Sequence, residues 1–369
     1  MCALNFEKIS LAIIAGGKSS RLGQDKRFIE IGGMSLLENV LRKSAAQNFS
    51  EIFLCVEKNS SRIADLATKY NAQILIDHIQ NAGALSGIVN GLQHSKNDWI
   101  LALSCDMPFF DFEILKSVTL SNDTSIIPIV DNRRQMLSAF YHKSAMEIFL
   151  RELENHRNKI SDAVEKISHE FITVENSSVN FFNVNTQADL KLARGRFENL
   201  SRKIPIVSIV APSSGTGKTT FIEKVTRKLS SDLKIAVIKS DAHGFNLDIE
   251  GKDSQRFQNA GAKSVAVISP SGWFMIQKTE TREDFLNVAE KFDGIDLILT
   301  ESRSHGIFPA ISLWRGNGEV VRDEKVSAIF SIKPEISTEF FQADLNDINT
   351  AIKIILFLAG LKSGDVFAK

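Results

Sequence analysis

Residues 207–229 join an apolar run, VSIVA, to a glycine-rich loop, PSSGTGKTT, and then to an amphipathic segment, FIEKVTRKL. A strand that leads through such a loop into a helix surrounds phosphate oxygens with backbone N–H groups and a helix N-terminus. The strict P-loop pattern has glycine where Pro212 stands, but Gly-Lys-Thr-Thr is intact. This feature predicts an α/β fold with a phosphate site. An ordinary glycine turn before a helix is the weaker interpretation.

The motif assigns roles to the side chains of this loop. Lys218 reaches the β- and γ-phosphates, and Thr219 offers its hydroxyl to Mg²⁺. A later strand usually supplies an acid to the same ion, and Glu301, after the apolar run over 295–300, is our candidate. Asp241 is the alternative, and an exposed strand-end acid is an equally good interpretation of either residue. The expected nucleotide-binding residues of this loop are Ser214, Gly215, Thr216, Gly217, Lys218, Thr219 and Thr220.

A second glycine-rich loop follows the first apolar run of the chain, in LAIIAGGKSSRLGQDK. Ligands of α/β sheets bind at the carboxyl ends of strands, and Gly16 and Gly17 let the backbone approach a ligand closely. Arg21 and Lys26 are placed to neutralise a triphosphate there. Neither Gly-Lys-Thr nor GxGxxG is present, so this loop is neither a P-loop nor a dinucleotide fingerprint.

A metal ligand for this loop comes from WILALSCD, an apolar run that ends at Asp106 and is stopped by Met107-Pro108. Mg²⁺ is typically held by one or two carboxylates together with phosphate oxygens. An isolated acid at a strand end is more often an exposed turn residue. The loop over 16–26 makes the magnesium role the better interpretation of Asp106.

Short apolar runs alternate with amphipathic segments along the chain, which predicts βαβ units and mostly parallel sheets. We expect two tandem three-layer α/β domains, at residues 1–195 and 203–369. The pattern breaks at RGRFENLSRKIP, so we predict a short linker over 194–205. Ser35 and Glu38 form a capping-box pattern before an apolar helical face. The expected strands are 11–15, 52–56, 73–76, 99–104, 125–129, 206–211, 235–238, 265–268, 295–300 and 326–332.

Charge and cysteine content restrict the partners and the compartment. Lys plus Arg and Asp plus Glu both number 44, so no net field favours nucleic acid or an anionic membrane. The three cysteines form neither a CxxC pair nor an even disulfide set. The N-terminus is a poor signal peptide, and no apolar run is long enough to span a bilayer. We expect a cytoplasmic protein without nucleic-acid or membrane partners.

The first half of the chain resembles a known family. IIAGGKSSRLGQDK is similar to LAGGxSxRMGxDK, the signature of the molybdenum cofactor guanylyltransferases (the MobA family). Asp77 with NAGALSGI, then SCDMPFF, then FFNVNTQADL match further family segments in order, over about residues 10–193. Ala84 and Gln187 stand where the family usually has proline. The resemblance implies a Rossmann-like nucleotidyltransferase domain.

The second half resembles the P-loop partner of that enzyme, the MobB family. The resemblance is carried by SGTGKTTFIEK, AVIKSDAHGF, GKDSQRFQNAGA and LILTES. Ser240 stands where that family usually has histidine, and Ser302-Arg303-Ser304 replaces its Gly-aromatic-Lys. Together with Pro212, these departures concern GTP hydrolysis and partner docking more than phosphate binding. The chain therefore resembles a MobA–MobB fusion, and the resemblance implies a homodimer through the C-terminal domain.

The reaction that the resemblance implies joins GMP from GTP to the terminal phosphate of molybdenum-molybdopterin and releases pyrophosphate. No side-chain nucleophile is needed, so catalysis is positioning plus charge stabilisation. The implied catalytic residues are Lys26, Arg21 and Asp106, with Mg²⁺ as cofactor. Other implied partners are molybdoenzyme apoproteins and other proteins of cofactor biosynthesis. The implied nucleotide site is Ile14, Ala15, Gly16, Gly17, Lys26, Asp77 and Asp106, with Asn183 and Asn185 on the pterin side.

Other functions account for parts of this pattern. A cytidylyltransferase for the same cofactor typically reads LAAG, whereas Ala15-Gly16-Gly17 follows the LAGG form of the guanine-specific enzymes. A sugar-phosphate nucleotidyltransferase leaves the appended P-loop domain without a role. An adaptor that only binds GTP and delivers the pterin could dispense with Asp106 or Lys26, and both are present. The second domain itself is better interpreted as a GTP-binding adaptor with slow hydrolysis.

Overall fold

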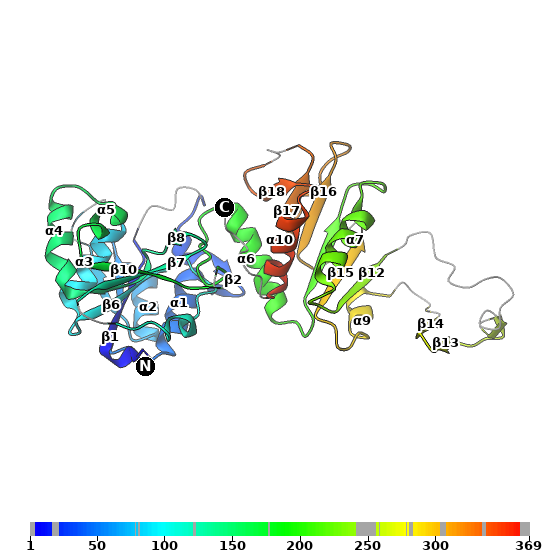
Figure 1. Ribbon diagram of the computed structural model, residues 1–369, viewed down its shortest axis with the longest axis horizontal. Coiled ribbons are helices and arrows are strands. Elements are labelled where there is room, and N and C mark those ends of the chain that lie inside the picture. The colour runs from blue at the N-terminus through cyan, green and yellow to red at the C-terminus, as the bar shows by residue number, and fades with distance from the viewer. Residues whose placement is uncertain are drawn as a thin grey trace.

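The computed structural model describes residues 4–16, 22–77, 79, 82–120, 123–175, 178–240, 256–257, 259–277, 279, 283–302, 308–333 and 337–361. Two sheets with covering helices lie side by side, the first built from residues 9–173 and the second from residues 206–344. Figure 1 shows the two sheets separated by helices α6 and α10. The predicted division into α/β units is therefore visible as two sheets.

The first sheet has the strand order β10-β7-β9-β6-β1-β4-β5, and β8 pairs with β7 at its side. Its pairs are parallel except those that involve β8 and β9. A small hairpin, β2–β3, follows the first glycine loop. The strands are β1 (Ile9–Ile14), β2 (Glu30–Ile31), β3 (Met34–Ser35), β4 (Glu51–Val56), β5 (Gln73–Ile76), β6 (Trp99–Ser104), β7 (Ser125–Val130), β8 (Arg133–Arg134), β9 (Ser138–His142) and β10 (His169–Thr173).

Helices cover both faces of this sheet, because its central strands bury both sets of alternating side chains. All of β1 is buried, and its odd and even positions pack into separate apolar clusters. One cluster contains α1 and α2, and the other contains α3, α4 and α5. The helices are α1 (Leu36–Ala45), α2 (Ser61–Lys69), α3 (Ala84–His94), α4 (Met146–Glu154) and α5 (Ile160–Val164), with short 3₁₀ turns at Phe6–Lys8, Lys26–Phe28, Phe112–Leu115 and Lys143–Ala145.

The second sheet has the order β12-β15-β11-β16-β17-β18, and its described pairs are parallel. Helices α7 and α10 pack on one face, and α9 packs on the other. The strands are β11 (Ile206–Val210), β12 (Ile235–Lys239), β15 (Leu297–Ser302), β16 (Ala310–Trp314), β17 (Val326–Ser331) and β18 (Phe341–Asp344). The helices are α7 (Lys218–Leu229), α9 (Phe285–Ala289) and α10 (Ile348–Ala359).

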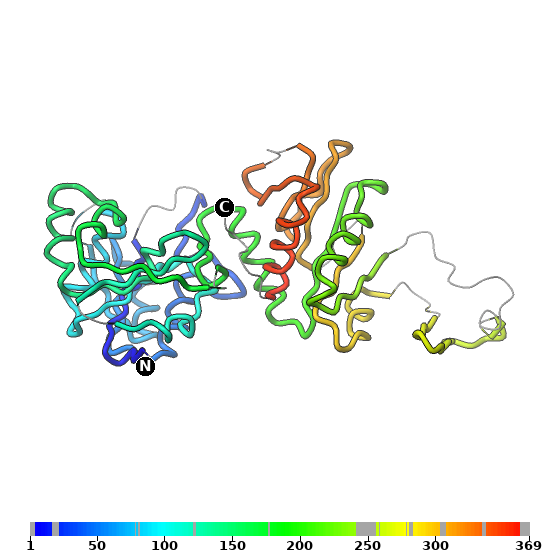
Figure 2. The backbone as a smooth tube through the Cα atoms, viewed as in Figure 1, coloured from blue at the N-terminus to red at the C-terminus, as the bar shows by residue number. Residues whose placement is uncertain are grey.

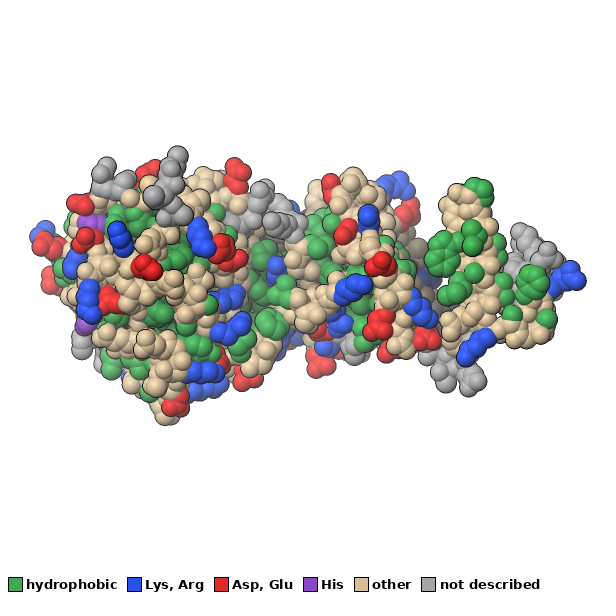
Figure 3. Space-filling model, turned by 90° about the horizontal axis from the view of Figure 1, so that it is seen from below, with side chains coloured by type: hydrophobic (Ala, Val, Ile, Leu, Met, Phe, Trp, Pro, Cys, Tyr) green, Lys and Arg blue, Asp and Glu red, His purple; other side chains and the backbone are tan. Residues whose placement is uncertain are grey.

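The predicted strands are present. The segment over 265–268 is β13 (Ser264–Ser269), which pairs antiparallel with β14 (Gly272–Gln277) outside the second sheet. Most of its side chains are exposed, unlike those of the strands in the second sheet. Trp273 is 71% exposed and Ile268 is 84% exposed. Figure 3 shows the hydrophobic side chains gathered at this end of the molecule.

The linker predicted over 194–205 was wrong in part, because helix α6 (Gln187–Leu200) continues through Leu200. Thr186 and Asp189 form a capping box that starts this helix. Arg196 and Asn199 are buried although their residue types suggested an exposed linker. They are buried because α6 packs against α10 and β17 of the second domain.

Helix α6 is the junction between the two domains. Towards the first domain, Gln187 donates to the carbonyl of Leu22, and the ring of Phe197 lies against Gly32. Towards the second domain, the Asn199 amide bonds the carbonyls of Ile206 and Leu358. In Figure 2 the green tube of α6 and the red tube of α10 run beside each other between the two halves. The domains therefore pack together around α6, and Phe109 and Phe182 of the first domain also contact Phe357 of α10 directly.

The contact between Gly32 and Phe197 predicts a stability difference between two neighbouring glycines. Gly32 has φ +61°, and a Cβ there would lie 1.8 Å from the ring of Phe197. Gly33 has φ +81° and nothing within 4 Å of its would-be Cβ. Both alanine variants should suffer left-handed strain of about 1 kcal/mol. Gly32→Ala should lose about 1–3 kcal/mol more, because the ring must move. Urea unfolding of both variants measures the difference, and equal losses would contradict the contact.

Candidate nucleotide sites

The first site lies where strands β1 and β6 end. The two strands are parallel neighbours with Ile14 opposite Ser104, so the loops after them leave the same edge of the sheet. The ammonium of Lys26 lies 2.6 Å from Oδ2 of Asp106, which brings together two of the predicted catalytic residues. The Asp106 side chain is 3% exposed and that of Lys26 is 20% exposed. Residues 80 positions apart thus form one ion pair at the expected edge.

Asp106 is held by the segments around it. Ser104 donates its hydroxyl to Oδ1 of Asp106 at 2.5 Å. The backbone N–H of Val184 donates to the Asp106 carbonyl, and that of Cys105 donates to the Ile14 carbonyl. One carboxylate oxygen therefore meets Lys26 and the other meets Ser104. Such a fixed carboxylate presents the same face to any ligand at the strand ends.

The charge state of Lys26 follows from its surroundings. Burial disfavours the ammonium, but the nearby Asp106 carboxylate more than offsets this, and the pKa of Lys26 is raised above its usual value. The side chain is consequently a cation at neutral pH. It holds a positive charge where the sequence predicts phosphate binding.

Asp77 lies beside the first glycine loop, as the resemblance implied. A Cβ on Gly16 would lie 3.5 Å from Oδ2 of Asp77, so the carboxylate is close to the loop backbone. Asn90, from α3, donates its amide to Oδ1 of Asp77 at 2.7 Å and orients the carboxylate. The backbone N–H of Ala15 bonds the carbonyl of Cys55 and continues the sheet to the edge of the loop. Ile14, Ala15 and Gly16 are therefore at the edge where ligands bind.

Arg27 belongs to this site although sequence reasoning missed it. Its guanidinium forms an ion pair with Asp25 at 2.6 Å and donates to the carbonyl of Ala15 at 3.3 Å. The bond to Asp25 raises the pKa of Arg27. Arg27 stands immediately after Lys26 and thereby ties the end of the loop to the end of β1. The one signal in the sequence was its place after the lysine of the motif.

Asn183 and Asn185 line an open pocket of about 330 Å³. Val184, which lies between them in the chain, donates its backbone N–H to the carbonyl of Asp106, so the segment that lines the pocket contacts Asp106. Asn183 donates to the Phe181 carbonyl, and the N–H of Asn185 donates to Asp189. Arg133 and Gln135, from the β7–β8 region, and the carboxylates Asp131 and Asp189 are also in the lining. The pocket is therefore polar and carries both charges.

Several predicted or noted residues lie outside the described part of the chain. In the first domain these are Gly17 and Arg21. In the second domain they are Asp241, Arg303 and Ser304. Their predicted roles stay predictions.

The second site is the P-loop between β11 and α7. Gly215 and Gly217 have φ +76° and +99°, values that favour glycine, and Gly217 is the N-cap of α7. The loop therefore has its glycines where the backbone requires them. Ser213 accepts hydrogen bonds from Lys218 and from the hydroxyl of Thr216 at its carbonyl. Lys218 is buried, and its ammonium reaches the carbonyl of Ser213 on the opposite side of the loop.

The predicted partners of the P-loop are also in place. The hydroxyl of Thr219 lies 2.9 and 3.0 Å from the two carboxylate oxygens of Glu301. Glu301 is carried there by β15, which pairs with β11 in parallel. Arg315, which was not predicted, donates to the carbonyl of Thr216 at 2.7 Å. A hydroxyl and a carboxylate thus meet at the start of the helix, as an Mg²⁺-binding P-loop requires.

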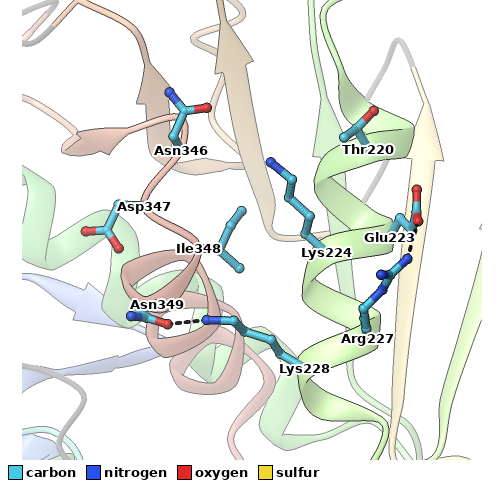
Figure 4. A pocket seen from close by; sticks show the side chains of 9 residues that line it. All are labelled: Thr220, Glu223, Lys224, Arg227, Lys228, Asn346, Asp347, Ile348 and Asn349. Carbon is cyan, nitrogen blue, oxygen red and sulfur yellow. Dashed lines mark hydrogen bonds and ion pairs between the residues drawn. The ribbon is translucent and has the colours of Figure 1, made fainter.

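Thr220 faces a different place from Thr219. It lines an open pocket of about 480 Å³ between α7 and the start of α10. Figure 4 shows Lys224 extending into this pocket towards Asn346, while Lys228 bonds Asn349. The side chain of Thr220 therefore lines this pocket, and its predicted nucleotide contact stays a prediction.

Comparison with known proteins assigns a family model to each half. Residues 11–169 match the model described as MobA-like NTP transferase domain. Residues 206–332 match the model described as molybdopterin guanine dinucleotide synthesis protein B. The first match contains Lys26 and Asp106, and the second contains the P-loop and Glu301. None of the described helices is long and apolar enough to cross a membrane.

Individual proteins are similar to each half of the chain. A "Probable molybdenum cofactor guanylyltransferase" of Clostridium perfringens (strain SM101 / Type A) is 32% identical over 207 residues, which cover 53% of this chain and 98% of that protein. Molybdopterin-guanine dinucleotide biosynthesis protein A of Archaeoglobus fulgidus, a crystal structure, is 25% identical, with a TM-score of 0.43, and covers 50% of this chain and 96% of its own. The crystal structure of molybdopterin-guanine biosynthesis protein B (mobB) is 24% identical, with a TM-score of 0.33. The match covers 42% of this chain and 99% of that protein.

Proposed function

The chain belongs to the family of molybdenum cofactor guanylyltransferases, and we propose that its first domain transfers GMP from GTP to molybdenum-molybdopterin at the Lys26–Asp106 site. The observation that carries the placement is the buried ion pair beside a glycine loop, at the shared edge of β1 and β6. The products are molybdopterin guanine dinucleotide and pyrophosphate. The enzyme is a nucleotidyltransferase.

In the proposed reaction, a terminal phosphate oxygen of the pterin attacks the α-phosphorus of GTP. A new P–O bond forms there, and the bond from the α-phosphorus to the β-phosphate bridging oxygen breaks. Pyrophosphate leaves with the electron pair of that bond. Lys26 and Arg21 neutralise the leaving pyrophosphate, and the backbone of residues 14–17 holds the nucleotide. The domain contributes orientation and charge.

The residues present fit Mg²⁺. Asp106 is a buried carboxylate that already lies against a cation, the ammonium of Lys26. A hard divalent ion takes such an oxygen together with phosphate oxygens. We propose that Asp106 holds Mg²⁺ in the first domain and that Thr219 and Glu301 hold it in the second. When bound, the ion neutralises charge on the triphosphate.

The pterin substrate is proposed to enter through the pocket lined by Asn183 and Asn185. The chain segment that lines this pocket contacts Asp106 through the backbone N–H of Val184, and no residue of the glycine loop is among the described residues of the lining. Its amides and the guanidinium of Arg133 are suited to hydrogen bonds with a polar heterocycle or its phosphate. The two substrates would then approach Asp106 from different segments.

Donor choice tests the proposed reaction. Purified protein is incubated with Mg²⁺, molybdenum-loaded molybdopterin and either GTP or CTP. Pyrophosphate and dinucleotide should form with GTP alone, since Ala15-Gly16-Gly17 follows the guanine-specific form. Product with CTP would contradict the interpretation of this tripeptide. Binding of GTP without any product would favour a delivery adaptor.

The second domain is proposed to bind GTP as an adaptor that presents the nucleotide, or a molybdoenzyme apoprotein, to the first domain. We also propose a cytoplasmic location, where GTP is available, and contacts with other proteins of cofactor biosynthesis. Support for GTP binding comes from the P-loop geometry and the contact between Thr219 and Glu301.

Lys218→Ala tests nucleotide binding by the second domain. Loss of the P-loop ammonium should weaken GTP binding there by about tenfold to a hundredfold, the usual cost of one charged hydrogen bond. Equilibrium binding of a fluorescent GTP analogue should show two sites in the wild type and one site in Lys218→Ala. Lys234→Ala, which removes an exposed lysine behind the sheet, is the control. Two unchanged sites in Lys218→Ala would remove the P-loop from nucleotide binding.

We further propose that the second domain forms a homodimer through the β13–β14 hairpin. A lone two-stranded hairpin is marginally stable in water, and this one exposes Ile268, Trp273 and Met275. Trp273→Ser with Ile268→Asp should shift the protein from dimer to monomer. Light scattering after size exclusion measures the mass, and an unchanged dimer would exclude the hairpin as the interface.

A further inference from the structure

An open pocket of about 370 Å³ lies at the junction between the two domains. We call it the junction pocket. Helix α1 supplies Lys43, helix α6 supplies Arg196 and Leu200, and loops of the first domain supply Gln47, Phe109 and Asn180. None of these residues belongs to either nucleotide site described above. The pocket is therefore a separate feature, made by the packing of α6 beside the first domain.

Arg196 is a buried cation in this pocket. It is 8% exposed, and one of its terminal nitrogens donates to the carbonyl of Phe357 at 2.7 Å. The guanidinium lies over the rings of Phe109 and Phe357, at 5.2 and 5.1 Å from their centres. Its Nε is buried without a hydrogen-bond partner. Within the described residues, no carboxylate forms an ion pair with Arg196.

Lys43 brings a second cation to the same pocket. Its ammonium donates to the carbonyls of Pro108 and Phe110, at 2.6 and 3.1 Å. Lys43 and Arg196 therefore both contact the segment around Phe109. Two of its three N–H groups are used in these bonds. Burial lowers the pKa of Lys43 to about 8, an effect that Asp111 partly opposes. Burial alone lowers the pKa of Arg196 to about 10.

The electrostatic balance of the pocket is therefore positive. Asp111 is the one carboxylate in its lining, and it also caps the turn at Phe112–Leu115 with its side chain. A buried cation without a counter-charge is costly, by several kcal/mol in general. Rings and carbonyls over a guanidinium offset part of this cost. An anion in the pocket would offset more, and the pocket has room for one.

We propose that the junction pocket binds a small tetrahedral oxyanion, such as free inorganic phosphate, between Arg196 and Lys43. An arginine fork and a lysine ammonium are the groups that proteins use for phosphate. Because Arg196 comes from α6 and bonds α10, while Lys43 comes from α1, an ion there ties the first domain to the helix that carries the second. The ion thereby strengthens the junction without entering either nucleotide site.

Selenate, a phosphate-sized dianion with an anomalous scatterer, locates the site directly. Crystals of the full chain are soaked in sodium selenate, and anomalous difference maps are calculated. The expected result is a selenium peak in the junction pocket within hydrogen-bonding distance of Arg196 and Lys43. Peaks at the P-loop or the first site, with none in the junction pocket, would overturn the proposal. A second soak that contains GMP distinguishes a site for free ions from a nucleotide site. A free-ion site keeps its selenium peak when GMP is present, whereas a nucleotide site loses the peak because GMP displaces selenate.

Variants test the same site in solution. Phosphate should raise the melting temperature of the wild type, and Lys43→Met should weaken phosphate binding in the pocket about tenfold or more. Arg194→Met is the matched control, because it removes an exposed cation from α6 outside the pocket. Its phosphate-dependent shift should equal that of the wild type. An equal shift in Lys43→Met would overturn the proposal, even with a selenium peak in the crystal. Because the selenate soak uses the wild type, its result does not depend on whether a variant folds.

Discussion

Replacing Asp106 by asparagine should lower guanylyl transfer by about 10³-fold. The change removes the negative charge that holds the ammonium of Lys26 at 2.6 Å, and it removes the proposed Mg²⁺ ligand. The loss of one preorganised charge-stabilising group typically costs about 10²–10³ in kcat, and the loss of a metal ligand adds to it. The measurement is kcat/KM for pyrophosphate release at saturating pterin and several Mg²⁺ concentrations.

Two controls separate charge from folding in this experiment. Asp65→Asn removes an exposed carboxylate from α2 and should leave the rate unchanged. Ser104→Ala keeps the Asp106 charge but removes the hydroxyl that orients it, so its rate should fall less than that of Asp106→Asn. If Asp106→Asn folds normally and retains more than about a tenth of the wild-type rate, Asp106 is neither a metal ligand nor a required partner of Lys26.

Lys26→Ala should lower the same rate by about 10²–10³-fold, the usual cost of one preorganised charge-stabilising donor. Its effect should appear mainly in kcat, because the ammonium is proposed to act on the charge that develops as pyrophosphate leaves. Lys58→Ala, an exposed lysine after β4, is the matched control. Near-normal turnover in Lys26→Ala would remove this lysine from the mechanism.

Lys26→Arg adds a distinction between charge and shape. Arginine keeps the positive charge, but its guanidinium is planar and larger than an ammonium. The site has little space for it, because only a fifth of the Lys26 side chain is exposed. Partial recovery relative to Lys26→Ala is expected. Full recovery would mean that a positive charge at this position is sufficient.

The strand-end residues of both sites could be predicted because their signal is local. The apolar run over 99–104 became β6 with the expected bounds, which placed Asp106 at the edge of the sheet. The P-loop was equally local, and the contact of Thr219 with Glu301 followed from two strand ends that the topology places side by side. Ser35 caps α1 as the pattern predicted, although Glu38 turns to Lys69 instead of completing the box.

Residues that act through long-range packing could not be predicted. Arg27 and Asn90 matter because of the carbonyl and the carboxylate they meet, and neither residue type signals such a partner. Gly195, Arg196 and Asn199 resembled an exposed linker because small and polar residues are uncommon in a buried helix face. They are buried because a second domain packs on α6. A Cβ on Gly195 would lie 2.5 Å from the Ser327 hydroxyl, so glycine permits this close approach.

We infer that guanylyl transfer takes place in the first domain and not at the P-loop. Dinucleotide formation from GTP and molybdenum-molybdopterin is measured in the wild type, Asp106→Ala and Lys218→Ala side by side. Product should disappear in Asp106→Ala and continue to form in Lys218→Ala. Product that persists in Asp106→Ala and disappears in Lys218→Ala would contradict this inference and place the chemistry in the second domain.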